Sequence, residues 1–361
     1  MRSVISVDPV GRTMLVEAGT PLQVVHEAAA AHGLIYPVDL GSRGSCTIGG
    51  NISTNAGGNT VVRYGMTRDN VLGLEVVLAG GRVIRTGTSA PKSAAGYDLT
   101  ALMVGSEGTL GLITELTLRL HGQPEAVSAA TCAFPDLTAA VDCVIATIQT
   151  GIPMARIEFL DAAAVAACNA YSGLSLPIAP LLLVEFHGSP RGVKEDATRF
   201  GGIAADFGSK GFDWASQQED RTRLWKMRHA AYPAILATRP GAKAIVTDVC
   251  VPISRLAEAV TETRADIDAS PLPGPILGHV GDGNFHAILL VDPDDAAEVA
   301  AAKRLANRMA ERALRLGGTI SGEHGVGIGK LGLMPQQHGQ AWAVMAAIKR
   351  ALDPHNLLNP G

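Results

Sequence analysis

The sequence predicts an α+β fold in two domains that meet near residue 122. Short strand patterns separated by glycine-rich stretches fill the part before Gly122-Gln123-Pro124. After that point strand patterns alternate with longer helical ones, as expected for a sheet covered by helices on one side. With 361 residues, the chain is long enough for two hydrophobic cores.

The first domain is expected to contain a small sheet and one capped helix. The helix runs from Pro21, a favoured first residue, to His32; Thr20 is its expected cap and Gly33 its end. Gly80-Gly81 predicts a hairpin turn between two alternating segments. The expected strands are 4–7, 14–17, 74–79, 82–86 and 112–120.

The second domain is expected to alternate between the two kinds of element. Helical periodicity predicts helices over 137–148, 161–171, 191–207, 217–237 and 293–316. Short apolar runs predict strands over 156–160, 181–187 and 246–253.

Charge and composition exclude several classes of protein. A net charge of −4 leaves no basic field for nucleic acid or an acidic membrane. Five scattered cysteines without a CxxC pair favour a reducing compartment. Apolar runs such as 181–184 are too short to span a bilayer, so no transmembrane segment is expected. Because residues 1–8 show no secretory leader, we expect a cytoplasmic protein in a bacterium, free or peripheral at the inner membrane face, or a mitochondrial protein in a eukaryote.

Two glycine clusters could approach a cofactor closely. Residues 46–58 contain four glycines and small polar side chains, which would place bare backbone N–H groups against an anion or a flat ring. The cluster is neither GxGxxG nor a P-loop, and the alternative is a tight exposed loop. The second cluster, 105–111, leads into a strand and could equally be an ordinary turn.

Histidines near the carboxyl end predict a metal site. His279 and His286 flank a Gly-Asp-Gly turn, and Glu323-His324 lies between two glycines. Imidazole and carboxylate together suit zinc or manganese. Adjacent residues of an extended segment point to opposite sides, so Glu323 could bind the ion while His324 acts as a base near neutral pH. The alternative is hydrogen-bonded structural histidines; the pattern is not HExxH.

Several motifs in a fixed order resemble the FAD-linked oxidase family of the vanillyl-alcohol-oxidase (PCMH) type, and within it the mitochondrial-type D-lactate dehydrogenases that pass electrons to cytochrome c. The resemblance covers almost the whole chain. The motifs are residues 46–58, 63–65, 92–99, 105–114, 278–286, 322–325, 353–354 and 359–361, with closer matches at 156–161, 236–241 and 247–254.

The resemblance implies a PCMH-type FAD-binding domain over 1–122 and a ferredoxin-like substrate or cap domain with an antiparallel sheet over 123–320. A carboxyl-terminal segment, 321–361, would return to the active site. Family members have a further lobe, with a glycine-rich loop for the FAD diphosphate, and residues 1–122 correspond to the lobe after it.

The resemblance also assigns roles to individual residues. The metal would be bound by His279, His286 and Glu323, the base beside flavin N5 would be His324, Asn284 would hold a substrate oxygen, and Arg228 would pair with the substrate carboxylate. FAD would lie along Pro37, Gly41, Gly49, Gly50, Asn51, Thr54, Asn55, Gly57, Gly58, Tyr64, Gly65, Glu107, Gly108, Gly111, Ile113 and Asn359. Without the resemblance, the sequence predicts that Arg228 is a charged residue on the solvent-exposed side of a helix.

The implied reaction is oxidation of D-lactate, or another D-2-hydroxy acid, to pyruvate or the corresponding 2-oxo acid. Hydride would pass to flavin N5 and electrons to cytochrome c, a quinone or a flavoprotein. D-2-hydroxyglutarate and glycolate are alternative substrates, and Lys243 is a candidate partner for a second carboxylate. A metal hydrolase and a non-catalytic, metal-binding remnant are competing hypotheses. A homodimer is compatible with the sequence, which does not fix the oligomeric state.

Overall fold

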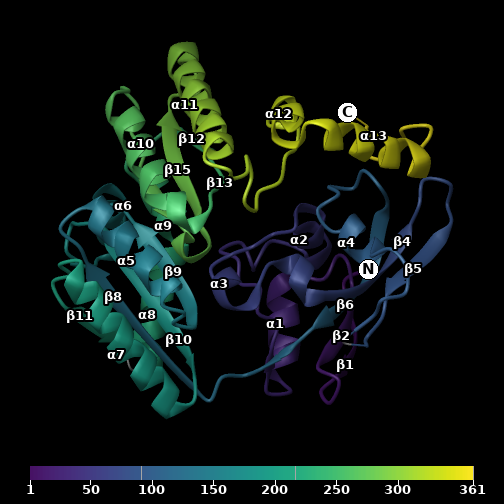
Figure 1. The fold of residues 1–361 in the computed structure, drawn as a ribbon, viewed down its shortest axis with the longest axis horizontal. Coiled ribbons are helices and arrows are strands. Elements are labelled where there is room, and N and C mark those ends of the chain that lie inside the picture. Colours follow the sequence, from purple (N-terminus) through teal and green to yellow (C-terminus); the bar gives the residue numbers. More distant parts are fainter. Residues whose placement is uncertain (91, 216, 361) are drawn as a thin grey trace. The chain divides into compact units, whose positions relative to one another are not determined.

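The computed structural model describes residues 1–90, 92–215 and 217–360. Gly361, the last residue of the closing motif, lies outside these ranges. The described chain forms two compact units: unit 1 consists of residues 1–123 and 323–361, and unit 2 of residues 124–322 (Figure 1). Each unit has its own sheet and is described separately.

Unit 1 contains an antiparallel sheet with the order β1-β2-β6-β4-β5. All five strands confirm strands predicted from the sequence, and the Gly80-Gly81 hairpin joins β4 to β5. A separate pair, β3 and β7, links Leu34–Ile35 to His121–Gly122. The sheet strands are β1 (Val4–Asp8), β2 (Thr13–Glu17), β4 (Val71–Val77), β5 (Val83–Gly87) and β6 (Leu112–Arg119).

Two helices of unit 1, the first and the second along the chain, pack against one face of this sheet. The first, α1 (Leu22–Ala30), is shorter than predicted, and its cap position is Pro21. The predicted cap, Thr20, therefore lies one residue too early, and its hydroxyl donates to the Ser3 carbonyl at 3.1 Å. The remaining helical segments are α2 (Ile48–Thr54), α3 (Val61–Tyr64), η1 (Thr67–Asn70), α4 (Leu99–Met103), η4 (Leu331–Leu333), α12 (Met334–His338) and α13 (Gln340–Leu352).

The unit 1 core forms where alternate residues of the sheet meet α1 and α2. Met14 and Val16 of β2 are fully buried, as are Leu22 of α1 and Ile48 of α2. Because side chains of a strand alternate between its faces, this pattern leaves the polar residues of β2, β4 and β6 on the other face.

Unit 2 contains an antiparallel sheet whose described strands have the order β11-β8-β10-β9-β14-β15-β12, with β13 also pairing with β15. The antiparallel sheet expected for the second domain is therefore confirmed. The strands are β8 (Ala126–Ala133), β9 (Met154–Leu160), β10 (Leu181–Gly188), β11 (Phe212–Ala215), β12 (Lys243–Val246), β13 (Val249–Cys250), β14 (Ile276–Gly278) and β15 (Asn284–Val291).

Helices cover both faces of this sheet, whereas the sequence pattern predicted helices on one face only. Leu181 and Leu183 of β10 join the core formed with α6, α8 and α9. Phe186 of the same strand points to the other face, where its ring packs 5.9 Å from that of Phe200 in α7. The helical segments are α5 (Leu137–Gln149), α6 (Ala162–Ser172), α7 (Pro190–Asp206), α8 (Gln218–His229), α9 (Ala231–Ala237), η2 (Ile253–Arg255), α10 (Leu256–Asp268), η3 (Val280–Asp282) and α11 (Ala296–Arg315).

Two predicted elements of unit 2 are broken in the structure. The helix expected over 217–237 ends at His229 and restarts at Ala231. Pro233 explains the break, because its ring would clash with the carbonyl four residues earlier in a continuous helix. The strand expected over 246–253 is reduced to β13, since β12 ends at Val246 and η2 begins at Ile253. Within the described ranges, every helix is too short or too polar to cross a lipid bilayer.

Candidate active site

One face of the unit 2 sheet gathers several predicted site residues. Leu277 of β14 lies opposite His286 of β15, and Gly278 lies opposite Phe159 of β9. Continuing this register by one residue places His279 beside Glu158, the neighbour of Phe159. Since residues two apart on a strand share a face, His286 and Asn284 point to the same side.

The two imidazoles of this face form a compact pair. Their ring centroids are 5.6 Å apart at an angle of 83°, and a ring nitrogen of each lies within 4.8 Å of the other. His279 Nδ1 is 2.7 Å from Glu158 Oε1, and His286 Nδ1 is 3.0 Å from the Thr247 carbonyl oxygen.

These partners determine which nitrogens can bind a metal. A carboxylate and a carbonyl only accept hydrogen bonds, so each Nδ1 carries the proton and each neutral ring has its lone pair on Nε2. Metal-binding histidines are commonly oriented in this way by a carboxylate or a carbonyl. The donor set of His279 and His286 therefore fits two ligands of a divalent ion.

Asn284 is held by its amide nitrogen. Nδ2 donates to Asp248 Oδ1 and to the Val249 carbonyl, both at 2.8 Å. Oδ1 is buried and has no hydrogen-bond partner within the described ranges. A buried acceptor without a partner is costly, so this atom fits a substrate hydroxyl that would donate to it.

Gly322 closes this side of the site. A Cβ at Gly322 would lie 2.1 Å from Asn284 Nδ2, and the preceding Ser321 hydroxyl donates to Asp248 Oδ2 at 2.7 Å. Only glycine therefore fits here without displacing Asn284. This contact accounts for the first glycine of the Gly322–Gly325 motif.

Arg228 is buried in α8, only 8% exposed. Its Nη2 lies 2.6 Å from Glu158 Oε2, an ion-pair contact. Nε and Nη2 have no partner with hydrogen-bond geometry in the described parts of the chain. The alternative of a solvated helix charge is therefore wrong, and the guanidinium retains donors for a carboxylate.

A second carboxylate anchors the same helix. Glu185 of β10 accepts hydrogen bonds from Trp225 Nε1 of α8 and from His187 Nε2 at 2.7 Å. Burial raises the pKa of the Glu185 carboxyl, but the charge of Arg156 and the hydrogen bonds outweigh it, so the pKa is lowered. Glu185 therefore stays ionised in the interior.

Sequence reasoning assigned no role to Glu158, Asp248 or Glu185. Each is a carboxylate within or beside a strand, with an exposed fraction of 0%, 1% and 4% respectively. An acidic residue inside an apolar strand pattern is rarely buried without a partner. That pattern, present at Glu158 and Glu185, is the signal that could have identified them.

In unit 1, the two glycine clusters lie side by side. Backbone N–H groups of Gly105 and Glu107 donate to the Ile52 and Ser53 carbonyls near the end of α2, at 2.8 and 2.9 Å. Asn55 ends α2 in the left-handed region at φ 54°. The structure thus joins two segments that the sequence separates by about fifty residues.

Two carboxylates of unit 1 join residues 322–327, the His324 turn, to these clusters by hydrogen bonds. Glu323 Oε2 accepts from Gly58 N at 2.6 Å. Glu107 accepts from Val326 N and Gly327 N at 2.6 and 2.9 Å. Asn359 Nδ2 in turn donates to the Glu107 carbonyl at 2.7 Å. Four predicted site residues therefore converge here, with His324 next to one of them.

The glycines of the first cluster serve mainly internal packing. A Cβ at Gly58, where φ is 93°, would lie 2.3 Å from the Asp39 carbonyl oxygen. The N–H groups of Gly49 and Gly50 already donate, to the Ala18 carbonyl and the Thr47 hydroxyl. The expectation of bare N–H groups is therefore not met at these positions. Gly41, by contrast, is exposed and open.

One buried atom of α2 fits an additional hydrogen-bonding group. Asn51 is 4% exposed, and its Nδ2 has no hydrogen-bond partner among the residues described. An amide N–H of this kind matches the carbonyl oxygens of a flavin ring. The other predicted FAD residues lie before α2 (Pro37, Gly41), at the ends of α2 and α3 (Thr54, Asn55, Gly57, Tyr64, Gly65) and around the start of β6 (Gly108, Gly111, Ile113).

The predicted metal ligands are divided between the units. His279 and His286 belong to unit 2, whereas Glu323 and the proposed base His324 belong to unit 1. The three-ligand site therefore stays a prediction.

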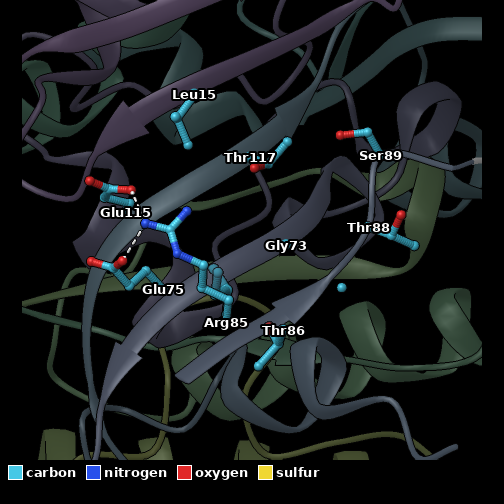
Figure 2. A pocket seen from close by; sticks show the side chains of 11 residues that line it. Leu15, Gly73, Glu75, Arg85, Thr86, Thr88, Ser89, Glu115 and Thr117 are labelled. Atoms are coloured by element: carbon cyan, nitrogen blue, oxygen red, sulfur yellow. Dashed lines mark hydrogen bonds and ion pairs between the residues drawn. The ribbon is translucent and has the colours of Figure 1, made fainter. Parts of the chain in front are cut away.

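Two cavities among the described residues lie away from the predicted site residues. One cavity, of about 180 Å³, lies on the polar face of the unit 1 sheet. Arg85 there lies 2.5 Å from Glu75 and 3.4 Å from Glu115, and Figure 2 shows the side chains that line this cavity. Another, of about 620 Å³, lies between α6 and the end of α10 in unit 2. No predicted site residue is among the described residues that line either cavity.

Comparison with known families identifies the family of the chain. Residues 123–361 match the family of FAD linked oxidases, C-terminal domain, and residues 1–87 match the FAD binding domain family. The chain belongs to the FAD-linked oxidase family, whose members are FAD-dependent oxidoreductases.

Individual relatives give the same result. A probable mitochondrial D-lactate dehydrogenase of Danio rerio is 48% identical over 350 residues, which cover 96% of this chain and 70% of the relative. A mitochondrial D-lactate dehydrogenase [cytochrome] of Arabidopsis thaliana is 42% identical, over 96% of this chain and 61% of the relative. A D-2-hydroxyglutarate dehydrogenase of Xanthomonas citri pv. viticola is 37% identical, over 98% and 75%.

The fold has counterparts among solved structures. The crystal structure of p-cresol methylhydroxylase with bound substrate matches with a TM-score of 0.77 at 18% identity, covering all of this chain and 77% of that one. This likeness confirms the PCMH-type fold. The chain spans between 61% and 70% of the length of the first D-lactate dehydrogenases that it matches.

Proposed function

We propose that this protein is an FAD- and divalent-metal-dependent dehydrogenase that oxidises D-lactate to pyruvate. The observation that carries the proposal is the set of groups on the unit 2 sheet face: two imidazoles with Nε2 lone pairs, a buried guanidinium and a buried amide oxygen without a partner in the described chain. These groups are complementary to a metal ion, a carboxylate and a hydroxyl.

Covalent connectivity supports the third metal ligand. Gly322 packs against Asn284 within unit 2, and Glu323 is the next residue. Consecutive Cα atoms are about 3.8 Å apart, so the backbone of Glu323 has to begin close to Asn284. The Gly58 N–H donates to Glu323 Oε2 at 2.6 Å, which helps to orient this carboxylate.

In the proposed mechanism, the chain orients the substrate and moves one proton. Arg228 pairs with the carboxylate, and Asn284 Oδ1 accepts a hydrogen bond from the hydroxyl. The hydroxyl then turns its single proton from Asn284 to His324, which removes it. When bound, the flavin supplies hydride acceptance at N5, and the divalent ion, zinc or manganese, supplies Lewis acidity that lowers the pKa of the hydroxyl.

The choice of D-lactate over D-2-hydroxyglutarate rests on Lys243. This residue, the sequence-based candidate for a second carboxylate, lies opposite Val291 in the β12–β15 pair. It is therefore five residues along β15 from His286, about 17 Å, and on the opposite face of the sheet. Since Lys243 cannot bind a second carboxylate there, a substrate with one carboxylate is favoured. The relative named D-2-hydroxyglutarate dehydrogenase makes this diacid the competing substrate to test.

Anaerobic flavin reduction tests the proposal. The purified protein with FAD, checked by its flavin absorbance, is mixed with D-lactate, L-lactate, glycolate and D-2-hydroxyglutarate. We expect D-lactate to reduce the flavin fastest and a strong chelator to abolish the reaction. Insensitivity to the chelator would remove the metal from the proposal, and a preference for the diacid would change the substrate. A protein that takes up no FAD would support the remnant hypothesis.

His324→Ala tests the base. The variant should retain its metal but reduce flavin with D-lactate at least about 100-fold more slowly, the usual range for a lost general base. His355→Ala is the matched control, since His355 is an exposed histidine of the same segment. Undiminished reduction in His324→Ala would exclude that residue as the base.

The electron acceptor is part of the same proposal. We propose cytochrome c, because the Arabidopsis relative carries "[cytochrome]" in its name. Turnover with D-lactate and cytochrome c, compared with turnover with a quinone, tests it. If only the quinone accepts electrons, the acceptor has been assigned wrongly although the dehydrogenase reaction stands.

A further inference from the structure

Glu158 is a fully buried carboxylate with two predicted site residues as partners. Its exposed fraction is 0%. One oxygen is 2.7 Å from His279 Nδ1, and the other is 2.6 Å from Arg228 Nη2. A single side chain therefore contacts both a proposed metal ligand and the proposed carboxylate-binding residue.

The buried charge of Glu158 requires both partners. A carboxylate removed from water is strongly destabilising unless a cation and hydrogen-bond donors compensate it. Arg228 supplies the cation, and the imidazole supplies a donor. In return, Glu158 holds the proton of His279 on Nδ1, so Nε2 is the ring nitrogen whose lone pair would coordinate a metal.

Strand register explains why one residue can reach both partners. His279 follows β14 at the position beside Glu158 of β9, while α8 covers the same sheet face with Arg228 directed at it. The neighbouring carboxylate Glu185 contacts Trp225, one turn earlier in α8. Two carboxylates thus fix α8, but only Glu158 also contacts an imidazole of the pair.

We propose that Glu158 is the positioning residue that couples metal binding to substrate binding: its one buried charge orients His279 toward the ion and holds Arg228 for the substrate carboxylate. This inference rests on the proposed function. It predicts that a change at Glu158 weakens both kinds of binding, although Glu158 contacts neither the metal nor the substrate.

Glu158→Gln and its matched control test the inference. Metal is removed from the full-length protein, and Mn²⁺ binding is measured by electron paramagnetic resonance. We expect Glu158→Gln to bind Mn²⁺ about 10- to 100-fold more weakly, as is typical when a residue that orients a ligand is lost. Glu185→Gln, which changes another buried carboxylate beside the same helix, should leave Mn²⁺ affinity unchanged.

Steady-state kinetics at saturating Mn²⁺ give the second readout. Because Arg228 loses its fixed partner in Glu158→Gln, KM for D-lactate should rise by a larger factor than kcat falls. If Glu158→Gln fails to fold, the double variant Glu158→Leu with Arg228→Met is used in the Mn²⁺ measurement instead. It removes both buried charges and keeps a similar side-chain volume. We expect the same weakening there.

The outcomes separate this inference from the proposed function. If the unaltered protein binds no Mn²⁺, the metal site itself is wrong and the role of Glu158 falls with it. If it binds Mn²⁺ and the Glu158 variants bind equally well, only the positioning role is overturned. Equal weakening in Glu185→Gln would likewise overturn it, because any buried carboxylate beside α8 would then have the same effect.

Discussion

The interactions that stabilise the candidate region of unit 2 differ from those that stabilise the candidate region of unit 1. In unit 2, strand pairing places buried side chains on one sheet face, and their charges compensate each other, as between Glu158 and Arg228. In unit 1, carboxylates on loops accept hydrogen bonds from backbone N–H groups, as Glu107 does from Val326. We therefore expect side-chain charge to dominate the first region and backbone geometry the second.

Arg228→Met should cause the largest loss of stability. Removing one partner of a buried ion pair leaves an uncompensated charge and costs about 3–5 kcal/mol. Urea unfolding followed by circular dichroism measures the loss. Adding Glu158→Leu to Arg228→Met should restore most of it. If the double variant is no more stable than the single one, Glu158 is not the group left uncompensated.

Glu107→Ala should weaken the His324 turn. The change removes the acceptor of two backbone N–H groups, at about 1.5–3 kcal/mol for each hydrogen bond to a charged group, less where water replaces it. Hydrogen exchange over 323–330 should accelerate. Glu115→Ala is the control, because Glu115 is 3.4 Å from the largely exposed Arg85 and should contribute less than about 1 kcal/mol. Unchanged exchange in Glu107→Ala would contradict the role of this carboxylate.

Gly58→Ala should destabilise unit 1 by about 1–3 kcal/mol, because the new Cβ would meet a backbone oxygen in a strained conformation. Thermal unfolding of this variant is compared with that of Gly41→Ala. Gly41 is exposed, and a Cβ added there would meet no atom within 4 Å among the described residues. Equal melting temperatures for the two variants would show that the close approach at Gly58 relaxes easily.

Asp353→Asn should have the smallest effect, a modest loss of stability near neutral pH together with a weaker dependence of stability on pH. Burial raises the pKa of the Asp353 carboxyl, but Lys349 and the N–H groups of Leu357 and Leu358 outweigh it and hold the pKa at about 2. Because the folded pKa lies below the ordinary value of about 3.9, the carboxylate stabilises the fold above pH 4. That contribution is lost as the pH falls toward 2.

Acid titration of urea stability measures this effect. The unaltered protein should lose stability between pH 4 and 2 more steeply than Asp353→Asn, which lacks the titrating group. Parallel curves for the two proteins would mean that Asp353 contributes nothing in this range.

Local sequence patterns were sufficient for most elements but not for the partners of the site residues. Alternating apolar residues predicted β6, and Gly80-Gly81 predicted the β4–β5 hairpin, because both signals lie within a few residues. The contact between Glu158 and His279 depends on the register of strands 121 residues apart, which a local pattern does not encode. The hydrogen bonds from Val326 and Gly327 to Glu107 were not predicted either, because these residues are also far apart in the sequence.

Some differences had a signal in the sequence. Pro233 was sufficient to divide the helix expected over 217–237. Helices on both faces of the unit 2 sheet were also predictable from β10, whose Leu181–Phe186 run is apolar at nearly every position, as in a strand buried on both sides. An apolar run of this kind excludes a solvated face.

Unit 1 is assembled from two stretches of chain between which the whole of unit 2 is inserted. Ile348 and Leu352 of α13 pack against a core that residues 14–120 otherwise form. During synthesis, the ribosome must therefore complete nearly two hundred intervening residues before this core receives its last helix. Unit 2, made from one continuous stretch, can finish folding first. Until α13 has been synthesised, part of the unit 1 core stays exposed to solvent.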